Sequence, residues 1–237
     1  MKVEIKDVPM FQNIIDILLK VKDEITFKFT PVGVKIVTTD PANVCASFMF
    51  IKREFFSMYE LDDEEKVTIN IIPIKKILKG VTSIVLETNG TKLIVKTDKR
   101  TVSLGTYDDD NVPVNQPTID FKTQLLINPA DMLASLDMVD VFSSSPEMIK
   151  FEYIDNILTV TAKNDSNKAD HTPDVKQTKD NVPFLSMFSY DYLKKLFHKG
   201  FKECIVYAGT DLPVKVQYNE ENIMIELFLA PRVYNND

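Results

Sequence analysis

The chain combines two patterns of apolar residues. In most short segments apolar and polar residues alternate, which predicts strands with one buried face, whereas a few segments repeat apolar residues every three or four positions, as amphipathic helices do. The strand-like segments include ITFKFTPVGVKIVTTD (25–40), CASFMFIKREFF (45–56), SIVLETNGTKLIVKTD (83–98) and IKFEYIDNILTVTAKND (149–165). The sequence therefore predicts a protein built mainly of strands.

Four segments carry the helical pattern. Pro9, Pro73 and Pro129 each fall in a first turn, where the missing N–H of proline costs nothing. Asn128 and Ser189 stand where N-cap residues are expected. The predicted helices cover residues 9–22, 73–79, 129–142 and 189–199.

Turn signals separate several of the strands. Asn89-Gly90 lies between two alternating runs and is a strong signal for a two-residue hairpin turn. Asp155-Asn156 and the Pro31 to Gly33 segment mark two further turns. Antiparallel pairing of neighbouring strands is the arrangement that such turns predict.

The helices and strands repeat along the chain. Pro9 opens the first helix and Pro129 opens another 120 positions later, while KKILKG ends at Gly80 and KKLFHKG ends at Gly200, which is the same offset. A strand pair follows each first helix, and further strands follow each second helix. This periodicity predicts two copies of one unit of helix, strands, helix and strands.

A polar segment containing proline, YDDDNVPVNQP (107–117), separates the two copies. Its composition is typical of a linker. We therefore predict an N-terminal domain over residues 1–107, a connecting segment over 108–117 and a C-terminal domain over 118–237. The predicted class is α+β, with two helices packed on antiparallel sheets in each domain.

The composition is that of an ordinary globular protein. The 237 residues carry a net charge of −7, which argues against a protein that grips nucleic acid over its whole surface. Cys45 and Cys204 stand alone and are expected to be small buried apolar residues rather than metal ligands. No run resembles a signal peptide or a membrane span, so we expect a soluble intracellular protein with no membrane partner.

No arrangement of residues predicts catalysis or a cofactor. His171 lies in a polar stretch with the character of a mobile loop, and His198 ends a predicted helix, where a positive charge suits the helix dipole. The acidic runs at 62–65 and 108–110 lack the ligand spacing of a calcium loop and are expected to be solvated turns. No glycine belongs to a phosphate-binding loop. We therefore expect no catalytic residue, no metal site, no cofactor and no enzymatic activity.

Three segments resemble DNA sliding clamps of the proliferating cell nuclear antigen family, of an archaeal or viral type. GVKIVTTDPANVCASFMFIKREFFSMYEL (33–61) resembles the core of the first clamp domain, with its aspartate-containing turn, and INIIPIKKILKG (69–80) resembles the second helix. DLPVKVQYNEENIMIELFLAPRV (211–233) is similar to the C-terminal signature, which ends in Leu-Ala-Pro, a basic residue and an apolar residue. The resemblance extends over residues 1–233.

The resemblance implies the DNA-clamp fold and a pseudo-six-fold ring, usually of three chains, with helices lining the hole. A protein that encircles duplex DNA needs no high affinity for phosphates, so an acidic chain can work in this way. The helix from residue 129 departs from the family because it carries three aspartates and no basic residue. The expected DNA-facing residues are Lys20, Lys22, Lys75, Lys76, Lys79, Lys194, Lys195 and Lys199.

The resemblance also implies an apolar pocket on one ring face. Partners of the family insert a short motif with a glutamine and aromatic or apolar residues there; DNA polymerase, clamp loader, nuclease and ligase are the partners expected. The pocket carried over to this chain comprises Thr39, Val44, Val112, Val114, Pro213, Phe228, Leu229, Ala230, Pro231 and Arg232. An alternative for Phe228 and Leu229 is that they simply close a sheet.

Ring closure implies that an edge strand before the linker pairs with an edge strand in the second domain of the next chain. Residues 100–107 suit the first role, and the second is expected within 169–181, which is polar and interrupted by Pro173. The expected interface residues are Thr101, Val102, Leu104, Tyr107 and Val175. This edge accepts either the same chain or a sister chain.

The function expected is that of a processivity factor, located at DNA in an archaeal cytoplasm, a nucleus or a viral replication site. One alternative is a subunit of a heteromeric or checkpoint-type clamp, which the polar edge favours. Another is an interaction protein with the clamp fold that never encircles DNA, which the acidic helix from residue 129 favours.

Overall fold

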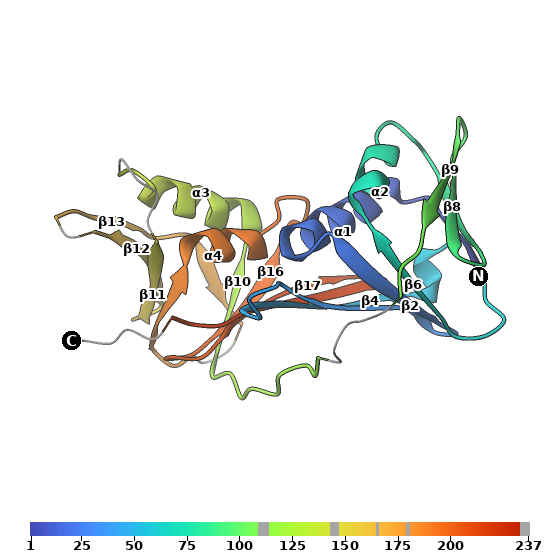
Figure 1. Ribbon diagram of the computed structural model, residues 1–237. Coiled ribbons are helices and arrows are strands. Elements are labelled where there is room, and N and C mark those ends of the chain that lie inside the picture. Colours follow the sequence, from blue (N-terminus) through green and yellow to red (C-terminus); the bar gives the residue numbers. More distant parts are fainter. Residues whose placement is uncertain (109–113, 143–146, 165, 179–180, 233–237) are drawn as a thin grey trace. The chain divides into compact units, whose positions relative to one another are not determined.

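The computed structural model describes residues 1–108, 114–142, 147–164, 166–178 and 181–232 (Figure 1). The chain divides into two compact units. Unit 1 comprises residues 1–116 together with 219–225, and unit 2 comprises residues 117–218 together with 226–237. The predicted connecting segment at 108–117 includes residues 109–113, which lie outside the described residues.

The described part of unit 1 contains two antiparallel sheets and two α-helices. One sheet has the strand order β5-β1-β7-β8-β9, and the second contains the order β4-β3-β2-β6. The elements are β1 (Lys2–Ile5), α1 (Val8–Val21), β2 (Glu24–Thr30), β3 (Gly33–Thr39), β4 (Cys45–Lys52), the 3₁₀-helix η1 (Arg53–Phe55), β5 (Met58–Glu60), β6 (Glu65–Asn70), α2 (Ile72–Ile77), β7 (Ile84–Asn89), β8 (Lys92–Lys96) and β9 (Thr101–Gly105).

Unit 2 repeats this plan. One sheet has the order β13-β12-β11-β15, and the other contains the order β14-β10-β16-β17. The elements are β10 (Thr123–Ile127), α3 (Pro129–Val139), β11 (Met148–Ile154), β12 (Ile157–Lys163), β13 (Lys168–His171), β14 (Val175–Gln177), β15 (Phe184–Ser189), α4 (Tyr190–Leu196), β16 (Cys204–Ala208), most of β17 (Val214–Glu220) and the second half of β18 (Ile223–Leu229). The end of β17 and the start of β18 belong to unit 1. The predicted α+β class and the predicted repeat of two helices on antiparallel sheets are confirmed.

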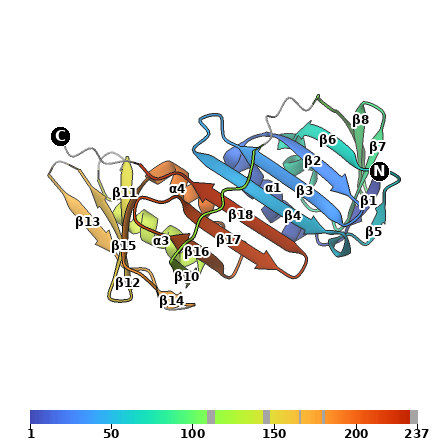
Figure 2. The same cartoon turned by 90° about the horizontal axis from the view of Figure 1, so that it is seen from below.

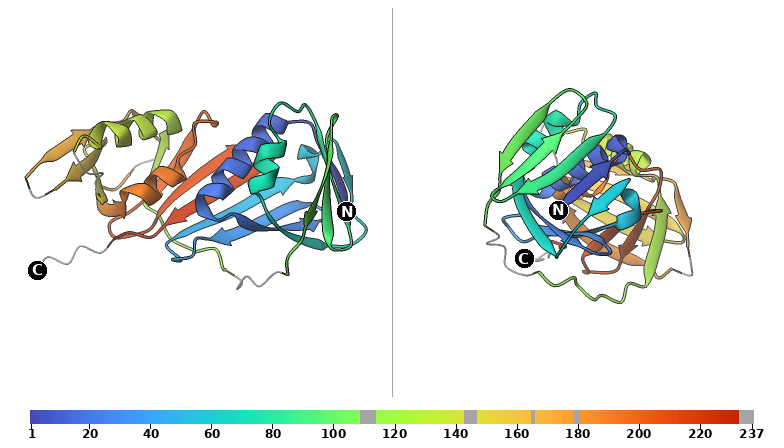
Figure 3. Two further views of the ribbon diagram at one scale, coloured as in Figure 1. Left: turned by 45° about the horizontal axis from the view of Figure 1, so that its top comes forward. Right: turned by 90° about the vertical axis from the view of Figure 1, so that its right-hand side faces the viewer.

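The helices of each unit lie side by side on one face of a sheet. Figures 1 and 3 show α1 beside α2 over β2, β4 and β6, and α3 beside α4 in the other unit. Figure 2 shows the opposite face, where the strands of unit 1 run next to one another. One side of each unit therefore presents helices and the other presents strands.

The first helix of each unit begins at an N-cap side chain, and the cap at Asn128 is the one that the sequence indicates. The Asp7 carboxylate accepts a hydrogen bond from the Met10 N–H at 3.0 Å, and the Asn128 side chain accepts one from the Ala130 N–H at 2.8 Å. Phe11, Ile14 and Leu18 form the buried stripe of α1, at the helical spacing of three and four residues. These caps and this stripe explain why α1 and α3 form where the pattern predicts them.

The ends of three predicted helices are corrected by the structure. The third ends at Val139 rather than at residue 142, and the second ends at Ile77 rather than at residue 79. The fourth ends at Leu196 rather than at residue 199, because Phe197 takes an extended conformation and is fully buried in the core. Burial of an aromatic side chain outweighs the continuation of a helical turn here. Ser189 occupies the N-cap of this fourth helix, with no side-chain capping bond.

The predicted hairpin turns are confirmed. In the β7–β8 hairpin Asn89 ends β7 and pairs with Lys92, so Gly90, at a φ of +60°, and Thr91 form the turn. Asp155-Asn156 connects β11 to β12, with φ values of 51° and 68°. Positive φ at both central residues of this second turn matches the right-handed twist of the strands, and Asn and Asp tolerate it well. These turns fix the register in which Ile154 faces Ile157.

Candidate functional site

The helix face of unit 1 carries five of the predicted lysines. Lys20 lies in the last turn of α1, Lys22 caps it, and Lys75 lies in α2. The Lys75 ammonium forms an ion pair with the Asp16 carboxylate of α1 at 2.7 Å. Burial lowers the pKa of Lys20, while the nearby Asp16 carboxylate partly offsets the effect. Two of these lysines are therefore engaged with a carboxylate within the helix pair.

The remaining two lysines of this face are exposed, at the end of α2. Lys76 lies in its last turn, and Lys79 lies just beyond its end rather than within it. The guanidinium of Arg100 donates to the carbonyl oxygens of Ile77 at 2.9 Å and of Lys76 at 3.3 Å. Sequence reasoning missed Arg100, whose only signal was a positive charge directly before β9. The end of α2 thus gathers three positive charges.

The helix face of unit 2 is organised differently. Lys194 of α4 forms an ion pair with Asp137 of α3 at 2.7 Å and donates to the Tyr190 hydroxyl at 3.1 Å. The hydrogen bond to Asp137 raises the pKa of Lys194, with the Tyr190 bond as the second cause. The Lys195 ammonium lies 4.4 Å from the centre of the Tyr192 ring. Lys199 is exposed and follows the helix rather than ending it.

The exposed side of α3 is acidic and apolar. Asp131, Ala134, Asp137 and Met138 are exposed there, and the helix has no lysine or arginine. Met138 exposes 57% of its surface, which shows that this side of the helix is not covered within the chain. The acidic character noted in the sequence therefore lies on the solvent side of α3, and the predicted lysines of this helix face lie in α4 and directly after it.

The predicted pocket residues of unit 2 differ in accessibility. Phe228 and Leu229, at the end of β18, are 5% and 1% exposed, so both are packed in the structure as the sheet-closing alternative predicts. Pro213 and Pro231 are half-buried, and Ala230 and Arg232 are exposed. The Arg232 N–H donates to the Met187 carbonyl oxygen at 2.7 Å, which fixes the end of the described chain against β15.

A buried ion pair lies beside Phe228 and was missed by sequence reasoning. The Lys215 ammonium of β17 contacts the Glu226 carboxylate of β18 at 2.9 Å, and their side chains are 15% and 7% exposed. The same ammonium lies 3.9 Å from the centre of the Tyr207 ring and 6.0 Å from that of Phe228. Burial and the negative charge of Glu226 raise the pKa of Tyr207. The pair thus positions two aromatic rings on one face of this sheet.

The predicted pocket residues of unit 1 flank a loop that a single carboxylate organises. Asp40 is buried and accepts hydrogen bonds from the N–H groups of Ala42 at 3.1 Å, Val44 at 2.8 Å and Cys45 at 2.7 Å. Thr39 ends β3 directly before this turn, and Val44 lies within it. Val114 is half-buried, and Val112 lies outside the described residues. Asp40 therefore fixes the backbone that carries two of the predicted residues.

Each unit has a strand at a sheet edge in the region where pairing between chains is expected. β9 pairs only with β8 in its sheet, and β13 pairs only with β12, so each strand has an unpaired side among the described residues. Val102 and Leu104 of β9 are half-exposed and lie opposite the buried Val95 and Leu93. Thr101 lies in the same strand, whereas the exposed Tyr107 follows it and forms a bridge with Thr68.

The region of the second expected edge, residues 169–181, contains parts of two edge strands in different sheets. Val175 lies in β14, opposite Ile127, whereas β13 pairs with β12. His171 lies in β13 rather than in a loop, and its Nδ1 is 2.9 Å from the Ser135 hydroxyl of α3. Alternation of small and polar residues gives β13 little local strand signal, so an edge strand in this region was expected from the family resemblance rather than from the pattern.

The described residues present no cluster of metal-binding type. No cluster of three or more histidine, cysteine, aspartate and glutamate side chains is present among them. Cys45 and Cys204 are buried and free, and burial raises the pKa of the Cys204 thiol to about 12, so this sulfur stays protonated and unreactive at neutral pH. No helix in the described ranges is long and apolar enough to span a membrane.

Comparison with known proteins finds relatives along the whole chain. Residues 1–122 match the family model described as proliferating cell nuclear antigen, N-terminal domain. The DNA polymerase sliding clamp of Methanococcus vannielii is 26% identical over 241 residues, with 94% of this chain and 95% of that protein covered. The DNA polymerase sliding clamp of Pyrococcus abyssi is 26% identical over 244 residues, with 94% of each covered.

Solved structures match over nearly the full length. A complex of PCNA2 and PCNA3 from Sulfolobus tokodaii matches with a TM-score of 0.86 at 22% identity, covering 98% of this chain and 99% of that chain. PCNA of A. fulgidus, solved with the C-terminal region of FEN-1 bound, matches with a TM-score of 0.86 at 20% identity and covers 99% of both chains. At these identities the match shows a shared fold.

Proposed function

The chain belongs to the proliferating cell nuclear antigen family, and on this premise we propose that it is a sliding clamp, a non-enzymatic processivity factor that encircles duplex DNA. The proposal includes tethering of DNA polymerase and of repair proteins, and an intracellular location at DNA. Relatives named DNA polymerase sliding clamp cover 94% of the chain, and this extensive coverage is the observation that carries the proposal.

The repeated helix pairs support the DNA-encircling role. Each unit has two helices on one side of its sheets, with lysines gathered near the ends of α2 and α4. Lys76, Lys79 and Arg100 form the more open positive cluster, whereas Lys194 is held by Asp137. We propose that unit 1 makes the stronger contacts with phosphates and that unit 2 contributes mainly through Lys195 and Lys199. Contacts with DNA phosphates that are weak and unequal between the two units allow a ring to slide along the duplex.

Within unit 2, we propose that partner peptides contact the surface formed by Pro213 and residues 228–232. Pro213 and Pro231 are half-buried and Ala230 is exposed, so an apolar side chain of a peptide can reach them. Phe228 and Leu229 support this surface from below, because both are packed into the sheet. PCNA of A. fulgidus binds the C-terminal region of FEN-1, and a partner segment of this kind is what we propose for this chain.

We propose that β9 of one chain pairs with β13 of the next to close the ring. Both strands lie at sheet edges, and Val102 and Leu104 of β9 would be covered by such pairing together with Ala169 of β13. The ion pair between Lys168 and Asp170 at 2.7 Å keeps the outward side of β13 polar. A polar edge is tolerated in solution before assembly because it resists non-specific strand addition.

A heteromeric ring is the second candidate. The Sulfolobus tokodaii structure contains two different clamps, PCNA2 and PCNA3. The short β13 of four residues gives few hydrogen bonds for pairing with an identical chain. In this case the present chain would close a ring only with a sister chain.

Two measurements on the purified full chain test the proposal. Light scattering after size exclusion should give about 81 kDa for a ring of three 27.1 kDa chains. With the family's clamp loader and ATP, the clamp should be retained on nicked circular DNA and lost when that DNA is linearised. Equal retention on circular and linear DNA would refute encirclement. A monomer that gains retention only with a sister clamp would favour the heteromeric ring.

A further inference from the structure

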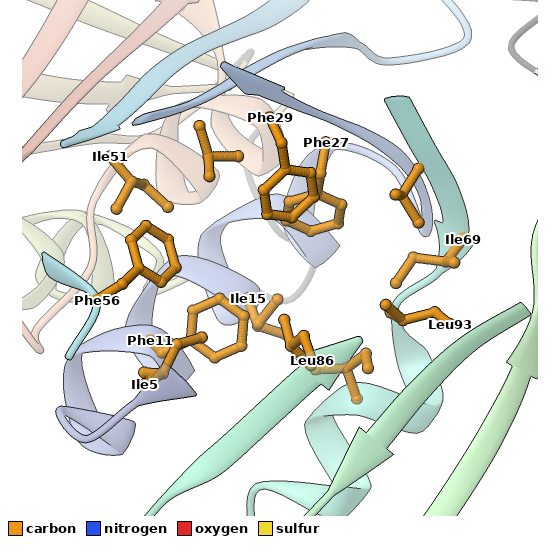
Figure 4. Close-up of a pocket in the computed structure, with 13 residues that line it drawn as sticks. Ile5, Phe11, Ile15, Phe27, Phe29, Ile51, Phe56, Ile69, Leu86 and Leu93 are labelled. Carbon is orange, nitrogen blue, oxygen red and sulfur yellow. The ribbon is translucent and has the colours of Figure 1, made fainter. Parts of the chain in front are cut away.

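The core of unit 1 contains a cavity of about 20 Å³ between its two sheets and beneath its helices (Figure 4). Figure 4 shows the rings of Phe11, Phe27, Phe29 and Phe56 and the side chain of Leu86 directed toward one space. All of the lining residues belong to unit 1. They are Ile5, Phe11, Ile15, Phe27, Phe29, Val34, Ile51, Phe56, Val67, Ile69, Ile74, Leu86 and Leu93.

The lining is entirely apolar and belongs to the buried core. None of its side chains exposes more than 8% of its surface, and none carries a nitrogen or oxygen atom. A space of this size has room for about one water molecule, but a buried water needs two to four hydrogen-bonding partners. These walls offer none from their side chains. The cavity therefore disfavours water and favours a guest that needs only dispersion contacts.

Hydrogen bonds next to the cavity fix Tyr59, whose ring packs near two of the aromatic walls. The Tyr59 hydroxyl donates to the carbonyl oxygens of Thr30 at 2.8 Å and Gly33 at 3.2 Å. The Tyr59 ring lies 5.2 Å from the Phe56 ring and 6.5 Å from the Phe29 ring, centre to centre. Side chains braced in this way cannot simply collapse into the space, so the cavity persists as part of the packed core.

We propose that this cavity is a binding site for a single small apolar guest, of the size of a noble-gas atom or a one-carbon molecule. Polarisable aromatic walls strengthen dispersion contacts with such a guest. The guest enters through transient rearrangement of the surrounding side chains, because the lining is nearly closed to solvent. The site lies within unit 1 and is independent of the sliding-clamp function.

Xenon is the probe for the test, with the full chain labelled at the methyl groups of isoleucine, leucine and valine. Under increasing xenon pressure, the NMR signals of Ile15, Ile69 and Leu86 should shift and reach saturation. The methyl signals of Leu125 and Leu136 in the core of unit 2 serve as an internal control and should show only a small linear drift. Equal linear drift in both units would overturn the proposal.

Two variants sharpen the result. Val67→Ile adds one methyl group to the lining and should abolish the saturable shift; Val34→Ile serves the same purpose if the first variant fails to fold. Leu86→Ala enlarges the space and should allow benzene, which the original cavity is too small to admit, to raise the melting temperature of the variant. A saturable xenon response that survives both valine substitutions would place the guest elsewhere and overturn the assignment.

Discussion

The ammonium of Lys194 lies 2.7 Å from the carboxylate of Asp137, so an ion pair joins α4 to α3. Unit 1 has a corresponding contact, in which Lys75 of α2 lies 2.7 Å from Asp16 of α1. Each unit thus uses one lysine to hold its helix pair together. These lysines are less available for phosphates than a count of basic residues suggests.

The Lys194–Asp137 pair has a defined pH dependence. Because the folded protein holds the pKa of Lys194 above its ordinary value, the stabilisation is fully present below the unfolded pKa and is lost as pH rises through the folded value. Both side chains are substantially exposed, so we expect Asp137→Asn to cost only about 0.5 kcal/mol at pH 7. The difference in unfolding free energy between wild type and variant should persist to pH 9 and vanish in strongly alkaline solution. A larger difference at high pH would contradict this sign.

DNA contact should be stronger in unit 1 than in unit 2. Replacing Lys76 by alanine removes one exposed charge, and the slope of log affinity against log salt should fall by about 1. Lys194→Ala is the matched control, because its ammonium is already paired with Asp137, and we expect a smaller change in slope. Clamp-dependent polymerase stimulation should follow the same order. Equal salt slopes for the two variants would contradict the prediction that unit 1 contacts DNA more strongly than unit 2.

Asp40 should control the loop that carries Val44. Asp40→Ala leaves three backbone N–H groups without their carboxylate acceptor, and we expect a loss of about 2–4 kcal/mol in unfolding free energy. Asp40→Asn keeps one side-chain oxygen, which can still accept from Val44 and Cys45, and should lose less. Denaturant unfolding followed by titration of a glutamine- and aromatic-containing peptide checks both effects. If folded Asp40→Ala binds the peptide with unchanged affinity, the loop does not contribute to partner binding.

The buried Lys215–Glu226 pair should respond asymmetrically to substitution. Lys215→Met leaves a buried carboxylate without its partner and should cost about 3–5 kcal/mol. The double variant Lys215→Met with Glu226→Leu should recover most of that loss, because two apolar side chains replace two charges. Thermal unfolding of the single and double variants measures the coupling. Additive losses would show that the two side chains act independently.

Ring closure should depend on the side of β9 that bears Leu104. Leu104→Asp places a charge where strand pairing would bury it, and the assembled mass should fall to that of a single chain. Ser103→Asp is the matched control, because Ser103 is the exposed neighbour on the opposite side of the strand. Circular dichroism confirms that both variants are folded. If Leu104→Asp keeps the mass of the assembled ring, the chains pair through a sheet edge other than β9.

Local signals in the sequence were sufficient for most of the fold. Pro9, Pro129 and the Asn128 cap located two helices, and Asn89-Gly90 located a hairpin, because each acts on the backbone within a few residues. The end of α4 was not predictable in this way, because it depends on burial of Phe197 in a core assembled from distant strands. β13 has no clear local signal for a similar reason, since its pairing with β12 rather than its composition makes it a strand.

The candidate site was predictable only in part. Residue types indicated the lysines and the C-terminal apolar segment, whereas their availability depended on partners from other elements. The partner of Lys194 lies 57 positions away, and that of Lys215 lies 11 positions away across a hairpin. Arg100 became part of the positive cluster only because its guanidinium reaches the end of α2. Such pairings follow from tertiary packing and leave no local pattern.

Residues 219–225 are part of unit 1 although the ribosome makes them after nearly all of unit 2. The Lys52 N–H donates to the Asn222 carbonyl oxygen at 2.8 Å, so one side of β4 receives this partner only at the end of synthesis. At roughly 5–20 residues per second, the delay after residue 116 is on the order of 5–20 s. During that time the nascent first half is left with an unsatisfied strand edge. Its maturation is therefore timed by the completion of the second half, and a truncated product would lack the final contacts of unit 1.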